Sequence, residues 1–63
     1  MTFIEQHKII ARLSYYSGKM SRVDYDEYEM LRSRDKEDED FEKPSRVRLQ
    51  ELYEKYVPER YRW

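Results

Sequence analysis

The chain has no cysteine, one glycine and two prolines among its 63 residues. Without cysteine it can form neither disulfides nor thiolates for metal binding or nucleophilic chemistry, and we expect a cytoplasmic setting. It also lacks any apolar run of the about 18 residues that a membrane span requires. Charged and polar side chains interrupt the apolar N-terminal stretch, which argues against a signal peptide. We therefore expect a protein that is neither cross-linked nor embedded in a membrane.

Charged residues make up 43% of the chain, yet aromatic residues make up 16%, and seven of them are tyrosine. Aromatic side chains supply large contact areas, so we expect a folded core and not a disordered chain. A chain of this length forms one domain at most, and we take residues 1–63 as a single domain. Its free energy of unfolding should be only about 3–5 kcal/mol.

A first helix is predicted over residues 3–17. Thr2 and Glu5 have the spacing of a capping box, and Gly18 is placed to end the helix in a left-handed conformation. Apolar side chains occupy two faces of this helix, so we expect it to be the central element. One face carries Phe3, Ile9, Ile10, Leu13 and Tyr16, and the other carries Ile4, Ala11 and Tyr15.

A second helix is predicted over residues 22–35, where Ser21 supplies the N-cap hydroxyl and Asp24 follows three residues later. Like charges then crowd the segment after Asp35, and we expect an acidic, partly mobile connection over residues 35–44.

The third helix is predicted over residues 46–57, after Pro44 and before Pro58, and residues 58–63 form a tail. No alternation typical of β-strands occurs. The sequence therefore predicts an all-α fold, a small three-helix bundle in which a short link makes the first two helices antiparallel.

The chain offers little for catalysis, because it has one histidine and no thiol to place in a shaped pocket. His7 falls on the apolar side of the first helix, where we expect a partly buried structural role. The acidic residues lack the glycine that the sharp turn of a calcium loop requires. We therefore expect no enzyme, no cofactor and no specific metal site.

Charge is sorted along the chain. Residues 1–23 sum to +3, residues 24–42 carry ten carboxylates against three basic side chains and sum to −7, and residues 43–63 sum to +3. We call residues 24–42 the acidic belt. A segment of this kind attracts basic surfaces and repels phosphate.

The acidic belt predicts binding to a basic, nucleic-acid-binding groove of a larger protein, with the chain acting as an inhibitor or adaptor that mimics nucleic acid. Carboxylates would speed association, and neighbouring tyrosines would anchor the complex. Small, charge-dense, cysteine-free chains are a style common among phage-encoded proteins that redirect host machinery, although no motif here identifies a family. The predicted contact residues are Asp24, Tyr25, Asp26, Glu27, Tyr28, Glu29, Asp38, Glu39 and Asp40.

Other interpretations of the charge pattern stay open. The belt can be a solvated linker, or it can meet the basic ends of a second copy. The chain can instead be a structural subunit of a larger assembly such as a virion. It can also be a DNA- or RNA-binding regulator that uses the basic start of the third helix and the aromatic tail. The residues for nucleic-acid or partner contact are then Arg46, Arg48, Arg60, Tyr61, Arg62 and Trp63, although Trp63 can equally fold back onto the core.

Overall fold

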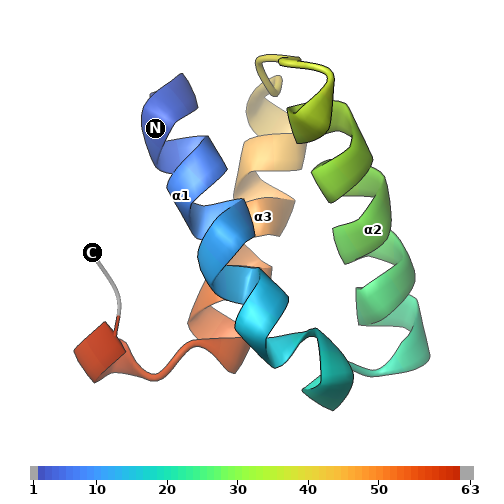
Figure 1. Ribbon diagram of the computed structural model, residues 1–63, viewed down its shortest axis with the longest axis vertical. Coiled ribbons are helices and arrows are strands. Elements are labelled where there is room, and N and C mark those ends of the chain that lie inside the picture. Colours follow the sequence, from blue (N-terminus) through green and yellow to red (C-terminus); the bar gives the residue numbers. More distant parts are fainter. Residues whose placement is uncertain (1, 62–63) are drawn as a thin grey trace.

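The computed structural model describes residues 2–61 and folds into a bundle of three α-helices (Figure 1). Each α-helix packs against the other two, and residues 2–61 contain no strand. The predicted all-α three-helix bundle is confirmed. The elements in chain order are α1 (Phe3–Leu13), the 3₁₀-helix η1 (Ser14–Lys19), α2 (Arg22–Lys36), α3 (Lys43–Tyr56) and the 3₁₀-helix η2 (Glu59–Tyr61).

Two side-chain caps fix where α1 and α2 begin. The Oγ1 atom of Thr2 accepts a hydrogen bond from the Glu5 amide at 3.1 Å, and the Oγ atom of Ser21 accepts one from the Asp24 amide at 3.2 Å. Each bond satisfies an amide that has no partner inside the helix. Both predicted caps are confirmed.

The third helix begins earlier than predicted, at Lys43. Pro44 lies in its first turn, where the missing amide hydrogen costs no helical hydrogen bond. The helix ends at Tyr56, before Pro58.

The predicted left-handed cap at Gly18 is wrong. The α-helical part ends at Leu13, and the chain then tightens into η1. The Ser14 hydroxyl donates to the Ala11 carbonyl at 2.6 Å, and the Ser17 hydroxyl donates to the Ser14 carbonyl at 3.1 Å. Gly18 has no positive φ. The 3₁₀ turns therefore end the first helical segment without left-handed backbone at Gly18.

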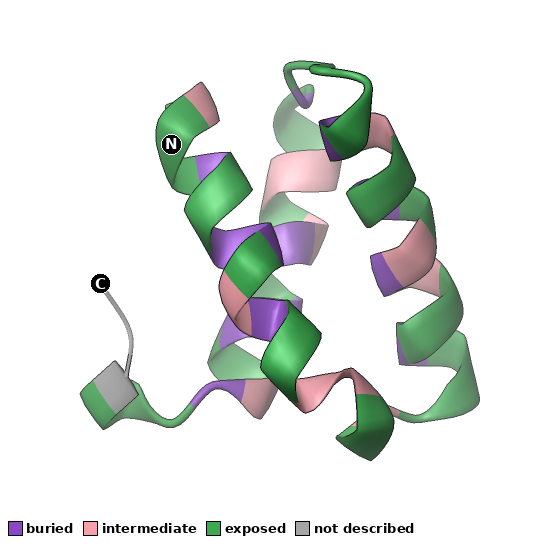
Figure 2. Ribbon diagram, in the orientation of Figure 1, coloured by how far each residue is buried: buried purple, intermediate pink, exposed green. Residues whose placement is uncertain are grey.

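The core lies between the three helices, and Figure 2 shows the buried segments on the sides that face one another. Apolar residues from the α2–α3 connection and from the end of α3 complete it. Its buried apolar side chains are Ile9, Ile10, Leu13, Tyr28, Leu31, Phe41, Leu49, Leu52, Tyr53 and Val57.

The prediction that the first helix is central and apolar on both faces is wrong for its second face. Ile4 is 67% exposed, Tyr15 is 79% exposed, and Ala11 between them is exposed as well. Within residues 2–61 this face of α1 is open, and α1 packs against α2 and α3 as they pack against each other.

Helix α2 ends at Lys36, one residue beyond the predicted end, and the connection that follows is bonded to α1 through Gln6. The buried Gln6 amide donates from Nε2 to Asp35 Oδ1 at 3.0 Å and to the Glu39 carbonyl at 2.9 Å. Its Oε1 atom accepts from the Phe41 amide at 3.1 Å. Gln6 therefore attaches the acidic connection to α1 at Glu39 and Phe41 and bonds the end of α2 at Asp35, which the charge pattern does not predict.

His7 is exposed, and the prediction of a partly buried histidine is wrong. Its Nδ1 atom lies 2.7 Å from Oδ2 of Asp35, on the outside of the same junction. None of the helices in residues 2–61 combines the length and the apolar character needed to cross a membrane.

Candidate functional site

Most carboxylates of the acidic belt form ion pairs within the molecule. Six of its ten carboxylates lie within 4 Å of a lysine or arginine: Asp24, Glu27, Glu29, Glu39, Asp40 and Glu42. A seventh, Asp35, lies 2.7 Å from Nδ1 of His7. Several of the partners belong to α3. The alternation of charge along the chain therefore has a structural role, because it pairs the middle of the sequence with the third helix.

Asp24 is 5% exposed, and its carboxylate bonds three side chains of α3. Its Oδ2 atom accepts from Lys55 Nζ at 2.7 Å and from the Tyr56 hydroxyl at 2.5 Å, and its Oδ1 atom accepts from Arg48 at 2.7 Å. The bonds from Lys55 and Tyr56 hold the pKa of the Asp24 carboxyl well below its ordinary value. Asp24 is therefore removed from the predicted partner-binding surface, because its oxygens are already satisfied inside the protein.

Tyr28 belongs to the core as well, and its predicted role as a surface anchor is wrong. Its side chain is 2% exposed, and burial raises the pKa of its hydroxyl. Tyr25 lies beside it, with 6.3 Å between ring centroids, and remains 41% exposed. Of the two predicted tyrosine anchors, only Tyr25 is available at the surface.

Arg34 gathers the carboxylates at the far end of α2. It pairs with Glu39, donates to Glu42 Oε2 at 2.7 Å and donates to the Ser45 hydroxyl at 2.7 Å. The Ser45 hydroxyl in turn donates to Glu42, and this bond is the main reason that the pKa of Glu42 falls to about 2. The Arg34 guanidinium also covers the buried Phe41 ring, 4.8 Å from its centroid. Glu39 is thus tied to α2 although its side chain reaches the surface.

The basic residues at the start of α3 also serve the fold. Arg48 bonds Asp24 and Glu27 on α2. Arg46 donates to the Phe41 carbonyl at 2.6 Å and lies 3.6 Å from Asp40.

The remaining residues of the predicted basic set lie at the end of the chain. Arg60 and Tyr61 belong to η2, and Arg62 and Trp63 lie outside the described residues. Of the six side chains predicted to contact nucleic acid, two are therefore bound within the protein. These two, Arg46 and Arg48, do not form a free basic surface.

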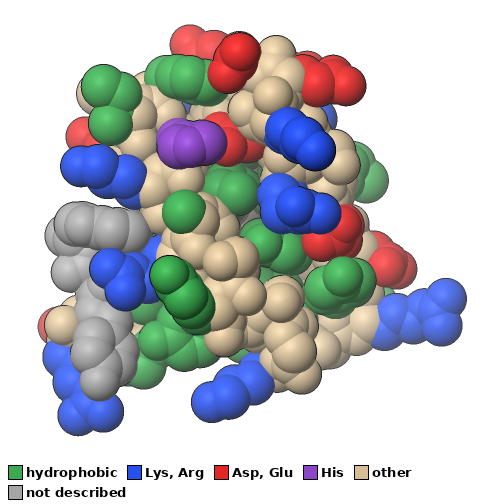
Figure 3. Space-filling model, viewed as in Figure 1, with side chains coloured by type: hydrophobic (Ala, Val, Ile, Leu, Met, Phe, Trp, Pro, Cys, Tyr) green, Lys and Arg blue, Asp and Glu red, His purple; other side chains and the backbone are tan. Residues whose placement is uncertain are grey.

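Three carboxylates of the belt, Asp26, Glu37 and Asp38, are exposed and form no ion pair with any residue in the range 2–61. Glu29 is half-buried and pairs with Arg32 along α2. Figure 3 shows acidic side chains gathered at the end of the bundle where α2 joins α3. We call residues 37–40 at this place the acidic end.

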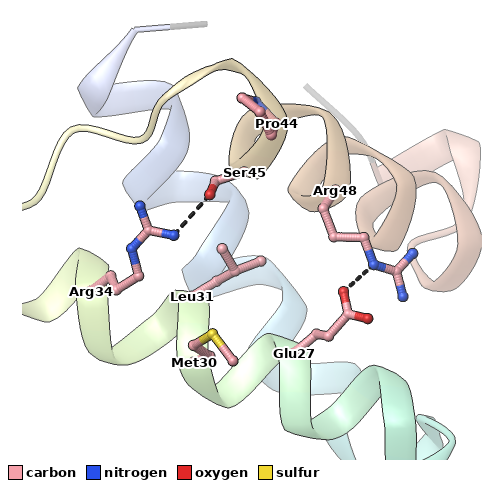
Figure 4. A pocket seen from close by; sticks show the side chains of 7 residues that line it. All are labelled: Glu27, Met30, Leu31, Arg34, Pro44, Ser45 and Arg48. Atoms are coloured by element: carbon pink, nitrogen blue, oxygen red, sulfur yellow. Dashed lines mark hydrogen bonds and ion pairs between the residues drawn. The ribbon is translucent and has the colours of Figure 1, made fainter.

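A hollow of about 240 Å³ opens between α2 and α3 (Figure 4). We call it the α2–α3 hollow. Buried Leu31 lies between two polar bridges, one from Arg34 to Ser45 and the other from Glu27 to Arg48. Met30 and Pro44 add apolar surface from opposite helices, and Met30 is 62% exposed.

The sequence did not predict this hollow, because Met30 and Pro44 lie on different helices and only the packing of α2 against α3 brings them to one place. Gln6 was missed as well, although it is an amide in the middle of an apolar helix face.

Within residues 2–61, no group of three or more His, Asp or Glu side chains is placed to hold a metal ion. No protein-family model, curated protein or solved structure matches the chain. Its function is therefore argued from its own surface.

Proposed function

We propose that this chain is a small, non-enzymatic protein-binding module that docks an acidic surface on a basic, nucleic-acid-binding groove of a larger protein. It would act there as an inhibitor or adaptor. The observation that carries the proposal is that the carboxylates of Asp26, Glu37 and Asp38 form no ion pair within residues 2–61, although most carboxylates of the belt do.

The surface that supports this proposal is smaller than the whole belt. It consists of the outer face of α2 and the acidic end, with exposed Tyr25, Val23 and Met30 as apolar contacts. Unpaired carboxylates at the rim of an interface speed association with a basic partner, whereas apolar side chains hold the complex once formed. Glu27, Glu29, Glu39 and Asp40 add negative potential, but each already has a basic neighbour.

The proposal is tested by competition with nucleic acid. A panel of basic nucleic-acid-binding domains is loaded with fluorescent duplex DNA, and the protein is titrated in. We expect the wild-type chain to displace DNA from at least one domain, with an affinity that falls as salt rises.

The test variant reverses the three unpaired carboxylates, D26K/E37K/D38K. Exposed ion pairs contribute about 0.2–1 kcal/mol each, so losing three should weaken binding by about tenfold. The matched control, E5K/E51K/E59K, makes the same change in net charge at exposed carboxylates of α1, α3 and η2. Equal losses in both variants, or no displacement of DNA from any domain, would contradict the proposal.

A further inference from the structure

We propose that the α2–α3 hollow receives one large apolar side chain of the partner, from a segment in which lysine or arginine flanks that apolar residue. This inference rests on the proposed function and names the chemistry of the partner at one place on the surface. It combines two observations, an apolar hollow open to solvent and an excess of negative charge around it.

The first observation is the shape and lining of the hollow. Its floor is Leu31 and its two sides are Met30 and Pro44, so a side chain entering it meets apolar surface on three sides. The polar bridges at its two ends are already formed within the protein, by Arg34 with Ser45 and by Glu27 with Arg48. An entering group therefore gains apolar contact without having to break or satisfy these polar groups.

The methionine supports this reading. Met30 lies on the rim of the hollow and is mostly exposed. Methionine has an unbranched and flexible side chain that fits irregular apolar partners, which is why it recurs at surfaces that bind other proteins. An exposed methionine over a buried leucine is therefore suited to receive an apolar side chain.

The second observation is the charge around the hollow. At one end, the Arg34 guanidinium faces two carboxylates, Glu39 and Glu42, so this group carries a net negative charge. At the other end, Asp24 and Glu27 are balanced by Arg48 and Lys55.

Two exposed carboxylates that form no ion pair within residues 2–61 lie before and after Met30 in the sequence. Asp26 lies about one helical turn before Met30 on α2, and Glu37 lies about two turns after it. The surroundings of the hollow are thus negative, and the complementary partner segment is basic on both sides of its apolar residue.

The experiment uses three synthetic peptides and the full chain. The first is a lysine-rich peptide of about 12 residues with one central leucine, long enough to cross the groove between two helices. The second replaces the leucine with alanine, and the third keeps the leucine but replaces each lysine with glutamate. Binding is followed by two-dimensional ¹H–¹⁵N NMR, in which the amide signals of Leu31, Ser45 and Arg48 report on the hollow.

We expect the leucine peptide to shift these three signals, the alanine peptide to bind at least about fivefold more weakly, and the glutamate peptide not to bind. The variant Met30→Glu should bind the leucine peptide about tenfold more weakly than the wild-type protein does. The added negative charge should by itself attract the basic peptide. A lower affinity would therefore come from the lost apolar contact and not from charge. The control is Ile4→Glu, which makes the same change at a similarly exposed residue on α1 and should leave binding unchanged.

The outcomes separate this inference from the proposed function. Equal binding of the leucine and alanine peptides would overturn the hollow as a site while leaving an acidic docking surface in place. Failure of every basic peptide to bind, together with failure of the DNA-displacement test, would overturn both. Binding of the glutamate peptide would overturn the basic character of the partner. If the wild-type protein is a dimer and Met30→Glu is a monomer, the hollow binds a second copy of this chain. That result would overturn the inference.

Discussion

Asp24 joins α2 to three side chains of α3 through its two carboxylate oxygens. Its backbone amide is capped by Ser21, and its carboxylate bonds Arg48, Lys55 and Tyr56 of α3. The Tyr56 hydroxyl also accepts from the Ser21 amide at 3.2 Å, which closes a small network at the start of α2. Buried networks of this kind stabilise a fold only while all their members are satisfied. The charge of Asp24 therefore stabilises the contact between α2 and α3.

We predict that Asp24→Asn lowers the free energy of unfolding by about 1–2 kcal/mol, because it keeps the shape of the side chain but removes the charge that Lys55 and Arg48 face. Urea titration followed by circular dichroism measures this loss.

The pH dependence of stability tests the role of Asp24 in a second way. The pKa of Asp24 is lowered in the folded protein, so its contribution is present above its ordinary pKa of about 4 and is lost as pH falls below that value.

Wild-type stability should accordingly fall between about pH 4 and pH 2, and the Asp24→Asn variant should show a smaller fall. Some pH dependence should persist in the variant, because the pKa of Glu42 is also lowered, to about 2. An identical pH profile for both proteins would show that the Asp24 charge does not stabilise the fold.

At the scale of the helices, the sequence predicts the capped starts of α1 and α2, whereas it misplaces the end of α1 and the start of α3. The hydroxyls of Thr2 and Ser21 act locally, within one turn, so their caps can be read from neighbouring residues. The end of the first helix depends on the serines of η1 bonding back to earlier carbonyls, which the position of Gly18 does not indicate. The attachment of residues 37–42 depends on Gln6, which is distant in sequence. Local signals were therefore predictable, and long-range polar contacts were not.

Gly18 gives a direct test of this difference. A glycine in a left-handed cap would resist replacement, whereas Gly18 has no positive φ and a Cβ atom built there meets nothing within 4 Å. We predict that Gly18→Ala raises the free energy of unfolding by about 0.4–1 kcal/mol, because alanine reduces the freedom of the unfolded chain. Thermal and urea unfolding measure the change. A loss of about 1 kcal/mol would instead favour the left-handed cap.

For the whole molecule, the main finding is that charges separated in sequence meet in space. The belt and α3 neutralise each other at Asp24, Glu27 and Asp40, through Lys55, Arg48 and Arg46. A count of charges along the chain could predict an acidic middle and basic ends. It could not predict which carboxylates stay unpaired, because that depends on how α2 and α3 face each other.

The same pairing gives a prediction about nucleic acid. Because Arg46 and Arg48 are engaged inside the protein, we expect no shift of duplex DNA by about 10 µM protein at about 150 mM salt. A mobility-shift titration over a range of salt concentrations tests this. Tight binding that weakens steeply with salt would show that the chain uses phosphate contacts, and it would favour the DNA- or RNA-binding alternative over the proposed function.

The Gln6 amide has a consequence for how the chain reaches this structure. It bonds residues 29, 33 and 35 positions further along the sequence. A pair of helices made of α2 and α3 alone would leave the Phe41 amide without its Gln6 acceptor and the Glu39 carbonyl without its Gln6 donor. The first helix thus helps to set the path of the chain between the other two. Docking of the first helix and closure of that turn become a single cooperative event, so no two-helix fragment of this protein should be a stable folding unit.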